Sequence, residues 1–353
     1  MATKKTVETE PESSLFDRLS KSHSSIIRKA GAIPLTERIP TGIAGLDVVT
    51  GGGWPRGRVI EVFGPESMGK TAMMLQCCKQ EIQAGNEPLF VDLERTLTLN
   101  HIDNQEKHSE RIQKKEEAIK AYGLSENLTV GYPIYGEETI DLVLKAVELG
   151  STLQVVDSLA LMFPKKVLDE IENNSEYNHP AMAIAAMFNR LSGKLLRGVE
   201  IAGSCVVFIN QIRDKVNSMH GGTHTPGGHA VHHLFSVRVE LTHSIKDKDK
   251  PGLIRTHIKV AKNKTHTAWL TTEIPILNGV VQLGRSLVFE AVKVGIIEKK
   301  GAWYKFSQEY LTLNNIEKEN VGNGEEKAGE FLEANQELYS LVYKDVLLKN
   351  GIV

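Results

Sequence analysis

The stretch RVIEVFGPESMGKTAMMLQCCKQ, residues 58–80, decides the fold. Its centre, GPESMGKT at residues 64–71, matches the phosphate-loop pattern G-x-x-x-x-G-K-[ST]. An apolar run typical of a buried strand precedes the motif, and a run typical of a helix follows it. In such a loop, backbone N–H groups point at phosphate oxygens, Lys70 reaches the β- and γ-phosphates, and Thr71 is a ligand for Mg²⁺. A chance match in a glycine-containing turn would lack this context, so the stretch predicts nucleotide binding.

The same alternation of strand and helix patterns continues beyond the motif. Short apolar runs recur in PLFVDLE at 88–94, LQVVDSLAL at 153–161 and SCVVFINQ at 204–211. Helical patterns accompany them at residues 70–85, 136–150 and 181–200. Near-continuous apolar strands that alternate with helices are typical of a parallel sheet covered on both faces. The fold class is therefore expected to be α/β, with a mostly parallel twisted sheet flanked by helices.

The two ends of the chain have a different pattern from this core. Residues 15–27 place apolar side chains at roughly helical spacing and predict a small helix outside the main core. Two β-rich segments, 234–244 and 254–264, continue the sheet or turn antiparallel. From residue 283 onward the pattern predicts short helices and a small β element, and therefore a second, α+β domain.

Composition limits the kind of protein this chain encodes. With 353 residues, 41% of them hydrophobic and 24% charged, it is expected to fold into about two domains. The net charge of −2 gives no overall basic field, so contact with a polyanion needs a local patch. Cys77, Cys78 and Cys205 are too few for a disulfide framework and favour a reducing compartment. No secretory signal or membrane span is recognisable, which predicts a cytoplasmic protein without a membrane partner.

Polar residues end three of the predicted strands, where a phosphate-loop protein needs them. Asp157 closes LQVVD and is the candidate for the carboxylate that organises Mg²⁺. Asp92 and Glu94 follow another buried run, and we assign the polarisation of the attacking water to Glu94 and a structural contact to Asp92. Gln211 ends FINQ, where its amide could bond a γ-phosphate or simply cap the strand.

Directly after Gln211 comes a glycine- and histidine-rich segment, QIRDKVNSMHGGTHTPGGHAVHH at 211–233. It has almost no periodic apolar face, which is typical of a loop that becomes ordered on a ligand. A metal site is one alternative, but no cysteine or carboxylate cluster accompanies the imidazoles.

Taken in order, GPESMGKT, FVDLE, VVDSLAL, FINQIRDKV, VAKNK and EKKGAWY resemble the RecA-type DNA strand-exchange recombinases from about residue 33 to near the C-terminus. The resemblance implies an ATP- and Mg²⁺-dependent DNA-stimulated ATPase. It also implies a helical filament on single-stranded DNA that pairs with homologous double-stranded DNA, with single-strand-binding or loader proteins as candidate partners. It divides the chain into an N-terminal helix and polymerisation arm at 1–32, a core with DNA-binding loops at 33–282 and a C-terminal domain at 283–353.

The resemblance also implies roles for individual residues. Lys262 and Lys264 of KNK would reach the γ-phosphate held by a neighbouring subunit, and His101 occupies the position of a tyrosine that packs on adenine. The residues implied to bind phosphates and Mg²⁺ are Gly64, Glu66, Ser67, Gly69, Lys70, Thr71 and Asp157. The residues implied to contact DNA are Met182 of a first loop and Arg213, Lys215, His220, Gly227, Gly228 and His229 of a second.

Several positions depart from the family pattern. His220 stands where the family often has phenylalanine, and His229 where it usually has asparagine. We therefore expect His220, His224 and His229 to become cationic near pH 6 and to strengthen DNA binding there. A charged insertion at 104–119 is read as a solvated surface helix, with a partner-binding role as the alternative. A ring-forming motor ATPase and a regulatory nucleotide-binding protein are the competing functions.

Overall fold

The computed structural model describes residues 14–24, 36–95, 120, 122–124, 126–172, 180–214, 223–224, 228–248 and 250–352. It contains two compact units, Met1–Glu37 and Arg38–Val353. The first unit contributes one helix, α1 (Leu15–His23), which begins with a capping box in which Ser14 and Asp17 bond each other's backbone N–H groups. None of the α1 side chains is buried within this first unit.

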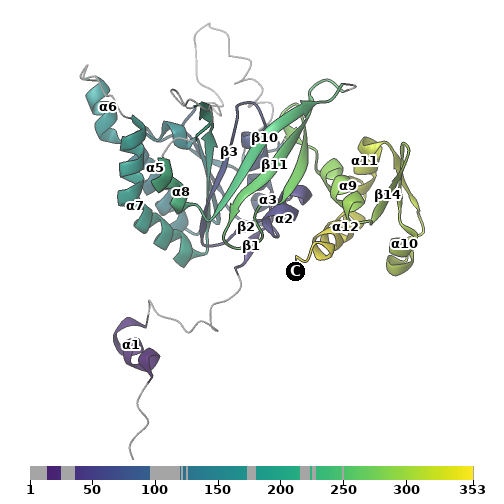
Figure 1. Ribbon diagram of the computed structural model, residues 1–353, viewed down its shortest axis with the longest axis horizontal. Helices are drawn as coiled ribbons and strands as arrows, with labels where there is room; N and C mark the ends of the chain where they lie inside the picture. The colour runs from purple at the N-terminus through teal and green to yellow at the C-terminus, as the bar shows by residue number, and fades with distance from the viewer. Residues whose placement is uncertain are drawn as a thin grey trace, which may run out of the picture. The chain divides into compact units, whose positions relative to one another are not determined.

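The second unit is built on a nine-stranded sheet with the order β13-β12-β11-β10-β3-β7-β6-β4-β5 (Figure 1). The six strands from β10 to β5 run parallel to one another, and β11, β12 and β13 continue the sheet antiparallel. This confirms the expected α/β fold with a mostly parallel sheet. The strands are β3 (Arg58–Gly64), β4 (Leu89–Asp92), β5 (Thr129–Gly131), β6 (Leu153–Asp157), β7 (Cys205–Gln211), β10 (Val237–Lys246), β11 (Leu253–Asn263), β12 (Thr271–Leu277) and β13 (Val280–Val281).

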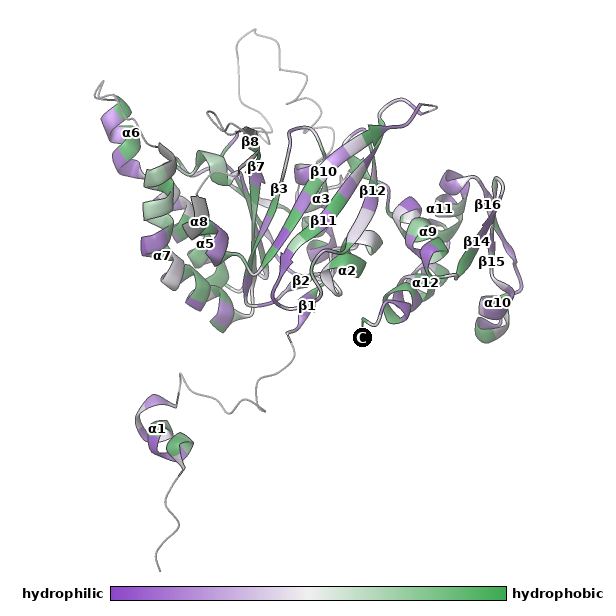
Figure 2. Cartoon of the chain, in the orientation of Figure 1, coloured by the Kyte–Doolittle hydropathy of each residue, from purple (hydrophilic) through white to green (hydrophobic). Residues whose placement is uncertain are grey.

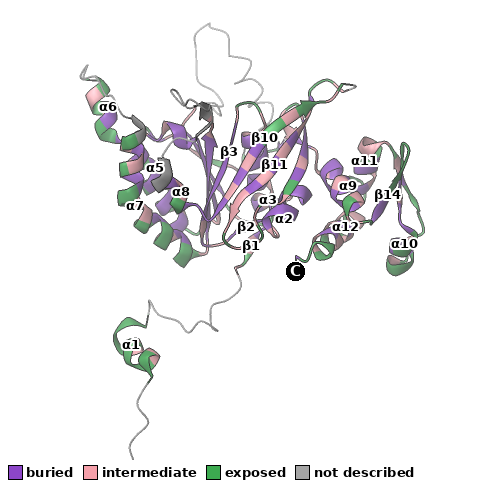
Figure 3. Ribbon diagram, viewed as in Figure 1, coloured by how far each residue is buried: buried purple, intermediate pink, exposed green. Residues whose placement is uncertain are grey.

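Helices cover both faces of the sheet, which explains why the central strands are apolar throughout. One core contains side chains of α2 (Ala44–Thr50) and α3 (Lys70–Gln83), and the other those of α5 (Gly136–Glu148), α7 (Pro180–Ala202) and α8 (Gly228–Leu234). Strand β3 is buried along almost its whole length (Figure 3). Strands β10 and β11 instead alternate hydrophobic and hydrophilic positions, because part of one face is less covered (Figure 2).

The C-terminal part of the chain forms a third core around a three-stranded antiparallel sheet, β14-β15-β16. Ala44 and Val48 of α2 belong to this core, so α2 is shared between it and the core beneath the large sheet. Its elements are α9 (Leu283–Lys293), β14 (Ile297–Lys300), β15 (Trp303–Phe306), α10 (Gln308–Asn314), β16 (Asn320–Asn323), α11 (Glu325–Glu333) and α12 (Gln336–Lys349).

The remaining described elements are short and lie in the connections, apart from α6. They are β1 (Arg38–Ile39), β2 (Trp54–Pro55), η2 (Leu159–Leu161), α6 (Lys165–Glu172), β8 (Arg213–Asp214) and β9 (Thr223–His224). Among the residues described above, no helix combines the length and the hydropathy needed to cross a bilayer.

The register of the parallel strands brings their carboxyl ends to one edge of the sheet. Gly64 at the end of β3 is paired with Gln211 at the end of β7, and Asp92 at the end of β4 with Asp157 at the end of β6. Ligands of open α/β sheets bind at this edge. The fold therefore gathers four of the polar or glycine positions noted in the sequence.

Candidate active site

The phosphate loop joins β3 to α3 through two glycines that no other residue could replace without strain. A Cβ at Gly64 would lie 2.5 Å from the carbonyl oxygen of Leu241 in β10. Gly69, the N-cap of α3, has a φ of 86°, and a Cβ there would overlap the side chain of Ile276 in β12. Because the backbone turns tightly at these glycines, the N–H groups of the loop and of the first turn of α3 can form an anion-binding surface.

Lys70 is buried at the start of α3 and its amine turns back into the loop. The Nζ atom donates hydrogen bonds to the carbonyl oxygens of Gly64, at 2.9 Å, and Pro65, at 2.6 Å. Glu66 and Ser67 are exposed at the tip of the loop. The amine is thus held at the centre of the backbone cradle, where phosphate oxygens are expected to lie.

Thr71 and Asp157 come together although 86 residues separate them. The Thr71 hydroxyl donates a 2.7 Å hydrogen bond to a carboxylate oxygen of Asp157, which is almost fully buried. Hydroxyl and carboxylate oxygens are the ligands that Mg²⁺ prefers, and this ion normally takes few protein ligands and completes its shell with water and phosphate. The pair fits that ion, even though the described residues contain no cluster of three or more His, Cys, Asp or Glu that could hold a metal.

Glu94 and Gln211 also meet at this edge of the sheet. The Gln211 side-chain amide donates a 3.0 Å hydrogen bond to Glu94 Oε1, and the Gln211 backbone N–H donates to Asn210 Oδ1 at 2.9 Å. Glu94 is only partly buried, whereas Asp92 is fully buried. A carboxylate that activates water must be reachable by water, and this favours Glu94 over Asp92.

The two lysines of KNK do not lie at the phosphate loop of their own chain. Lys262 is paired with Arg238 of β10, and Arg238 with Glu61, which precedes Gly64 by three residues in β3. The Lys262 amine donates a 3.0 Å hydrogen bond to the carbonyl oxygen of His232 in α8, and Lys264 is exposed just beyond β11. Burial lowers the pKa of Lys262, as do the nearby charges of Lys264 and Arg238.

The predicted second DNA-binding loop begins where β7 ends. Its first residues form β8, in which Arg213 is paired antiparallel with His224 of β9. Gly228 and His229 are the first two residues of α8. In the predicted first loop, Met182 lies in α7 with 67% of its side chain exposed. Lys215, His220, Gly227, His101 and the insertion at 104–119 lie outside the described residues.

A buried polar cluster that was not predicted from the sequence lies beneath the nucleotide edge. Glu61, in the middle of β3, is fully buried and accepts a 2.8 Å hydrogen bond from Asn210 Nδ2 and another from Arg238 Nε. The Arg238 guanidinium also lies over the Phe63 ring, 4.5 Å from its centre. Burial raises the pKa of Glu61 more than Arg238 and Asn210 lower it. The one available signal was a charged residue inside the apolar run RVIEVF.

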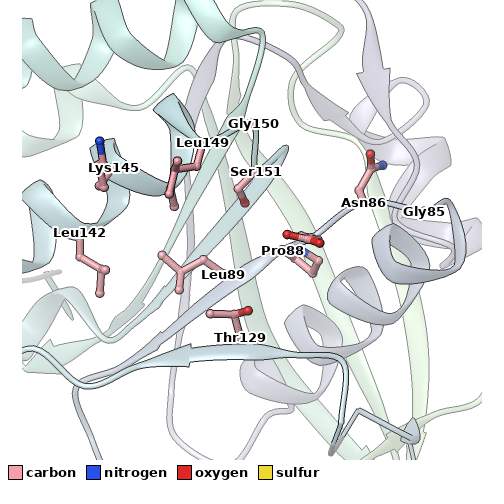
Figure 4. Close-up of a pocket in the computed structure, with 12 residues that line it drawn as sticks. Gly85, Asn86, Pro88, Leu89, Thr129, Leu142, Lys145, Leu149, Gly150 and Ser151 are labelled. Carbon is pink, nitrogen blue, oxygen red and sulfur yellow. The ribbon is translucent and has the colours of Figure 1, made fainter.

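A cavity of about 490 Å³ lies at the opposite edge of the sheet (Figure 4). Leu89, at the amino end of β4, and Leu142, Lys145 and Leu149 of the α5 region line it. None of its lining residues belongs to the phosphate loop.

Comparison with known proteins identifies the family. The family model of the RecA N-terminal domain matches residues 22–281, and that of the RecA C-terminal domain matches residues 286–351. Protein RecA of Acholeplasma laidlawii is 32% identical over 323 residues, which cover 90% of this chain and 88% of that protein. Protein RecA of Caulobacter sp. strain K31 is 33% identical over 86% of this chain and 78% of its own length. Protein RecA of Bacillus subtilis is 30% identical, with 89% and 85% covered. The chain belongs to the RecA family of recombinases.

Proposed function

We propose that this chain is an ATP-dependent homologous recombinase that forms a helical filament on single-stranded DNA, pairs it with a homologous duplex and exchanges strands. The observation that carries the proposal is the hydrogen bond between Gln211 and Glu94. Glu94 is the residue proposed to activate water, and Gln211 is the residue at which the predicted second DNA-binding loop begins, so this bond joins the two sites. A nucleotide at this edge and DNA on that loop would therefore act on the same pair of side chains.

The phosphate loop supports binding of the triphosphate. Lys70 and the loop N–H groups would bind phosphate oxygens, with Gly64 and Gly69 giving the close backbone approach, and Glu66 and Ser67 lying at the loop tip. Thr71 and Asp157 would hold Mg²⁺, which when bound neutralises phosphate charge. His101 is proposed to lie beside the adenine.

Glu94 and Gln211 have different proposed roles near the γ-phosphate. Glu94 would accept a hydrogen bond from the attacking water and orient it in line with the bond that breaks. Gln211 would exchange its bond to Glu94 for one to the γ-phosphate, which releases Glu94 and shifts the start of the second loop. Lys262 and Lys264 would supply positive charge to the nucleotide of a neighbouring subunit, since they lie away from the loop of their own chain.

The DNA contacts are proposed for Arg213, Lys215, His220, Gly227, Gly228 and His229 of the second loop and for Met182 of the first. Contacts of this kind go mainly to the DNA backbone, because base pairing supplies the recognition of sequence. Residues 1–32 would act as a polymerisation arm, residues 33–282 as the ATPase core and residues 283–353 as a separate C-terminal domain.

The test is ATP hydrolysis with and without circular single-stranded DNA, on wild type and Glu94→Gln, with electron microscopy of the same samples. We expect DNA-stimulated turnover in wild type and a fall of roughly 100-fold or more in the variant, which still forms filaments. Asp92 is not a suitable control because it is buried, so Glu87→Gln, at an exposed position before β4, is the control variant and should keep its turnover. Closed rings, or turnover that DNA does not change, would instead support the motor or regulatory ATPase.

A further inference from the structure

A row of polar side chains crosses four neighbouring strands in the middle of the large sheet. Asn210 of β7 donates a hydrogen bond to Glu61 of β3, and Arg238 of β10 forms an ion pair with the same carboxylate. Lys262 of β11 is the register partner of Arg238 and lies close enough for its charge to interact with both Arg238 and Glu61. These four residues are the polar row.

The polar row is embedded in apolar surroundings. Its carboxylate is fully buried, and it lies on the face of the sheet covered by α7 and α8, beside Phe208 and Val59. Well-packed apolar residues often replace a buried ion pair at no loss of stability, so its presence is weak evidence for a stabilising role. A buried, fully bonded polar network does fix the relative positions of the elements that carry it.

Each end of the polar row reaches a group that the proposed function uses. At one end, Asn210 accepts a 2.9 Å hydrogen bond from the backbone N–H of Gln211, whose side chain bonds Glu94. At the other end, the Lys262 amine bonds the carbonyl oxygen of His232, in the helix that follows the predicted second DNA-binding loop. Hydrogen bonds and charged contacts therefore connect the nucleotide edge with KNK and α8 through four strands.

We propose that Glu61, Arg238 and Asn210 are positioning residues that couple the Glu94–Gln211 pair to Lys262 and α8. When Gln211 moves toward a γ-phosphate, the bond of its N–H to Asn210 carries the displacement into the polar row. The displacement then changes the position of the Lys262 amine relative to the nucleotide of the next subunit. This inference rests on the proposed function and adds to it the route by which one nucleotide site affects the next.

The experiment measures DNA-stimulated ATP hydrolysis as a function of ATP concentration, beside nucleotide affinity without DNA. The informative variant is Glu61→Gln/Arg238→Gln, which removes both charges of the pair, keeps a polar side chain at each position and leaves neither partner as an unpaired buried charge. We expect affinity without DNA to stay within about twofold, because neither residue lies in the phosphate loop. DNA-stimulated turnover should fall roughly tenfold and its dependence on ATP should lose its cooperativity, as expected for typical coupling between sites.

Two further variants separate positioning from a purely structural role. Arg238→Lys keeps a cation opposite Glu61 and should recover part of the cooperativity. Arg190→Gln breaks an exposed ion pair with Glu137 on the helices of the same face and should behave as wild type. Equal turnover and equal cooperativity in wild type and the double variant would overturn the proposal.

A double-mutant cycle tests whether the polar row acts through Gln211. If it does, the double substitution lowers turnover less in a Gln211→Ala background than in wild type. Losses that are fully additive in free energy would contradict the route through Gln211. A wild-type protein that forms no filaments, or that DNA does not stimulate, would refute the proposed function itself, and this result is distinct from a failure of the polar row.

Discussion

Single side chains at the nucleotide edge have geometries that suit their proposed roles. Lys70 already lies in the backbone cradle, and Thr71 already bonds Asp157. The Gln211 side-chain amide donates a hydrogen bond to Glu94. Groups that are held in place beforehand lose little entropy when they bind, so we expect small changes at these positions to have large effects.

Thr71 gives the simplest test at this scale. Thr71→Val keeps the shape of the side chain but removes the hydroxyl that pairs with Asp157. We expect Mg²⁺-dependent binding of ATP to weaken by roughly 10- to 100-fold, whereas Thr71→Ser, which keeps the hydroxyl, stays within a few-fold of wild type. Titration of a fluorescent ATP analogue at several Mg²⁺ concentrations measures both. Equal affinities for the two variants would exclude Thr71 as a magnesium ligand.

Asp47 makes stability depend on pH. Burial raises the pKa of this carboxyl from 3.8 to about 6, although Tyr343 and Thr41 donate hydrogen bonds to it. The native state therefore binds this proton more tightly than the unfolded chain does. The stabilisation from this group is fully present below about pH 3.8 and is lost as the pH rises through about 6.

The comparison of wild type with Asp47→Asn isolates that contribution. Between pH 4 and pH 7, the unfolding free energy of wild type should fall by on the order of 2 to 3 kcal/mol relative to the variant. Denaturant titrations at a series of pH values between these limits measure the difference. Parallel stability profiles would show that Asp47 has an ordinary pKa in the folded protein.

The role of a residue could be predicted from the sequence when its neighbours in the chain form a recognisable pattern, and could not when its partners are distant in sequence. Lys70 and Thr71 belong to a contiguous motif, and Asp157 closes an apolar run, so their positions at one edge followed from strand polarity. Glu61 could not be interpreted in this way, because its partner Arg238 lies 177 residues away. Only the pairing of β10 with β3 brings the two together.

At the scale of elements, long periodic segments were predicted well and short strands were not. The four apolar runs became β3, β4, β6 and β7. Strands β5 and β13, of three and two residues, carry too few side chains to show a period. The strand order within the sheet also depends on contacts between distant segments, which a single sequence does not contain.

Helix α1 is the element whose proposed role is easiest to test. Leu15 and Leu19 are 65% and 40% exposed, and within its own unit no side chain of the helix is buried. If the helix docks on the next subunit of a filament, removal of residues 1–34 should abolish long filaments on DNA and leave nucleotide binding unchanged.

Point variants distinguish docking from a general effect of truncation. Leu15→Ala/Leu19→Ala should shorten filaments, because it removes apolar area from α1, whereas Arg18→Ala on the same helix should not. Electron microscopy of filaments on circular single-stranded DNA gives the readout. Long filaments from the truncated chain would contradict the polymerisation role.

For the whole molecule, a helical filament requires a repeated head-to-tail contact between subunits. Such a contact does not use the same surface on both partners, so subunits add without closing unless the rotation happens to make a ring. Lys262 and Lys264 lie away from the phosphate loop of their own chain, which suits this arrangement, because in the proposed function their charge would act on a nucleotide only after assembly. Variants that cannot assemble into filaments should then also lose DNA-stimulated ATP turnover, whereas a variant impaired only in hydrolysis should keep its filaments.

Strand exchange between circular single-stranded DNA and a linear duplex tests the recombinase function of this chain most directly. With ATP and Mg²⁺, we predict joint molecules and then nicked circles when the duplex is homologous, and neither product when it is heterologous or when ADP replaces ATP. Hydrolysis of ATP without joint molecules, or equal products from homologous and heterologous duplexes, would contradict the assignment of this chain as a recombinase.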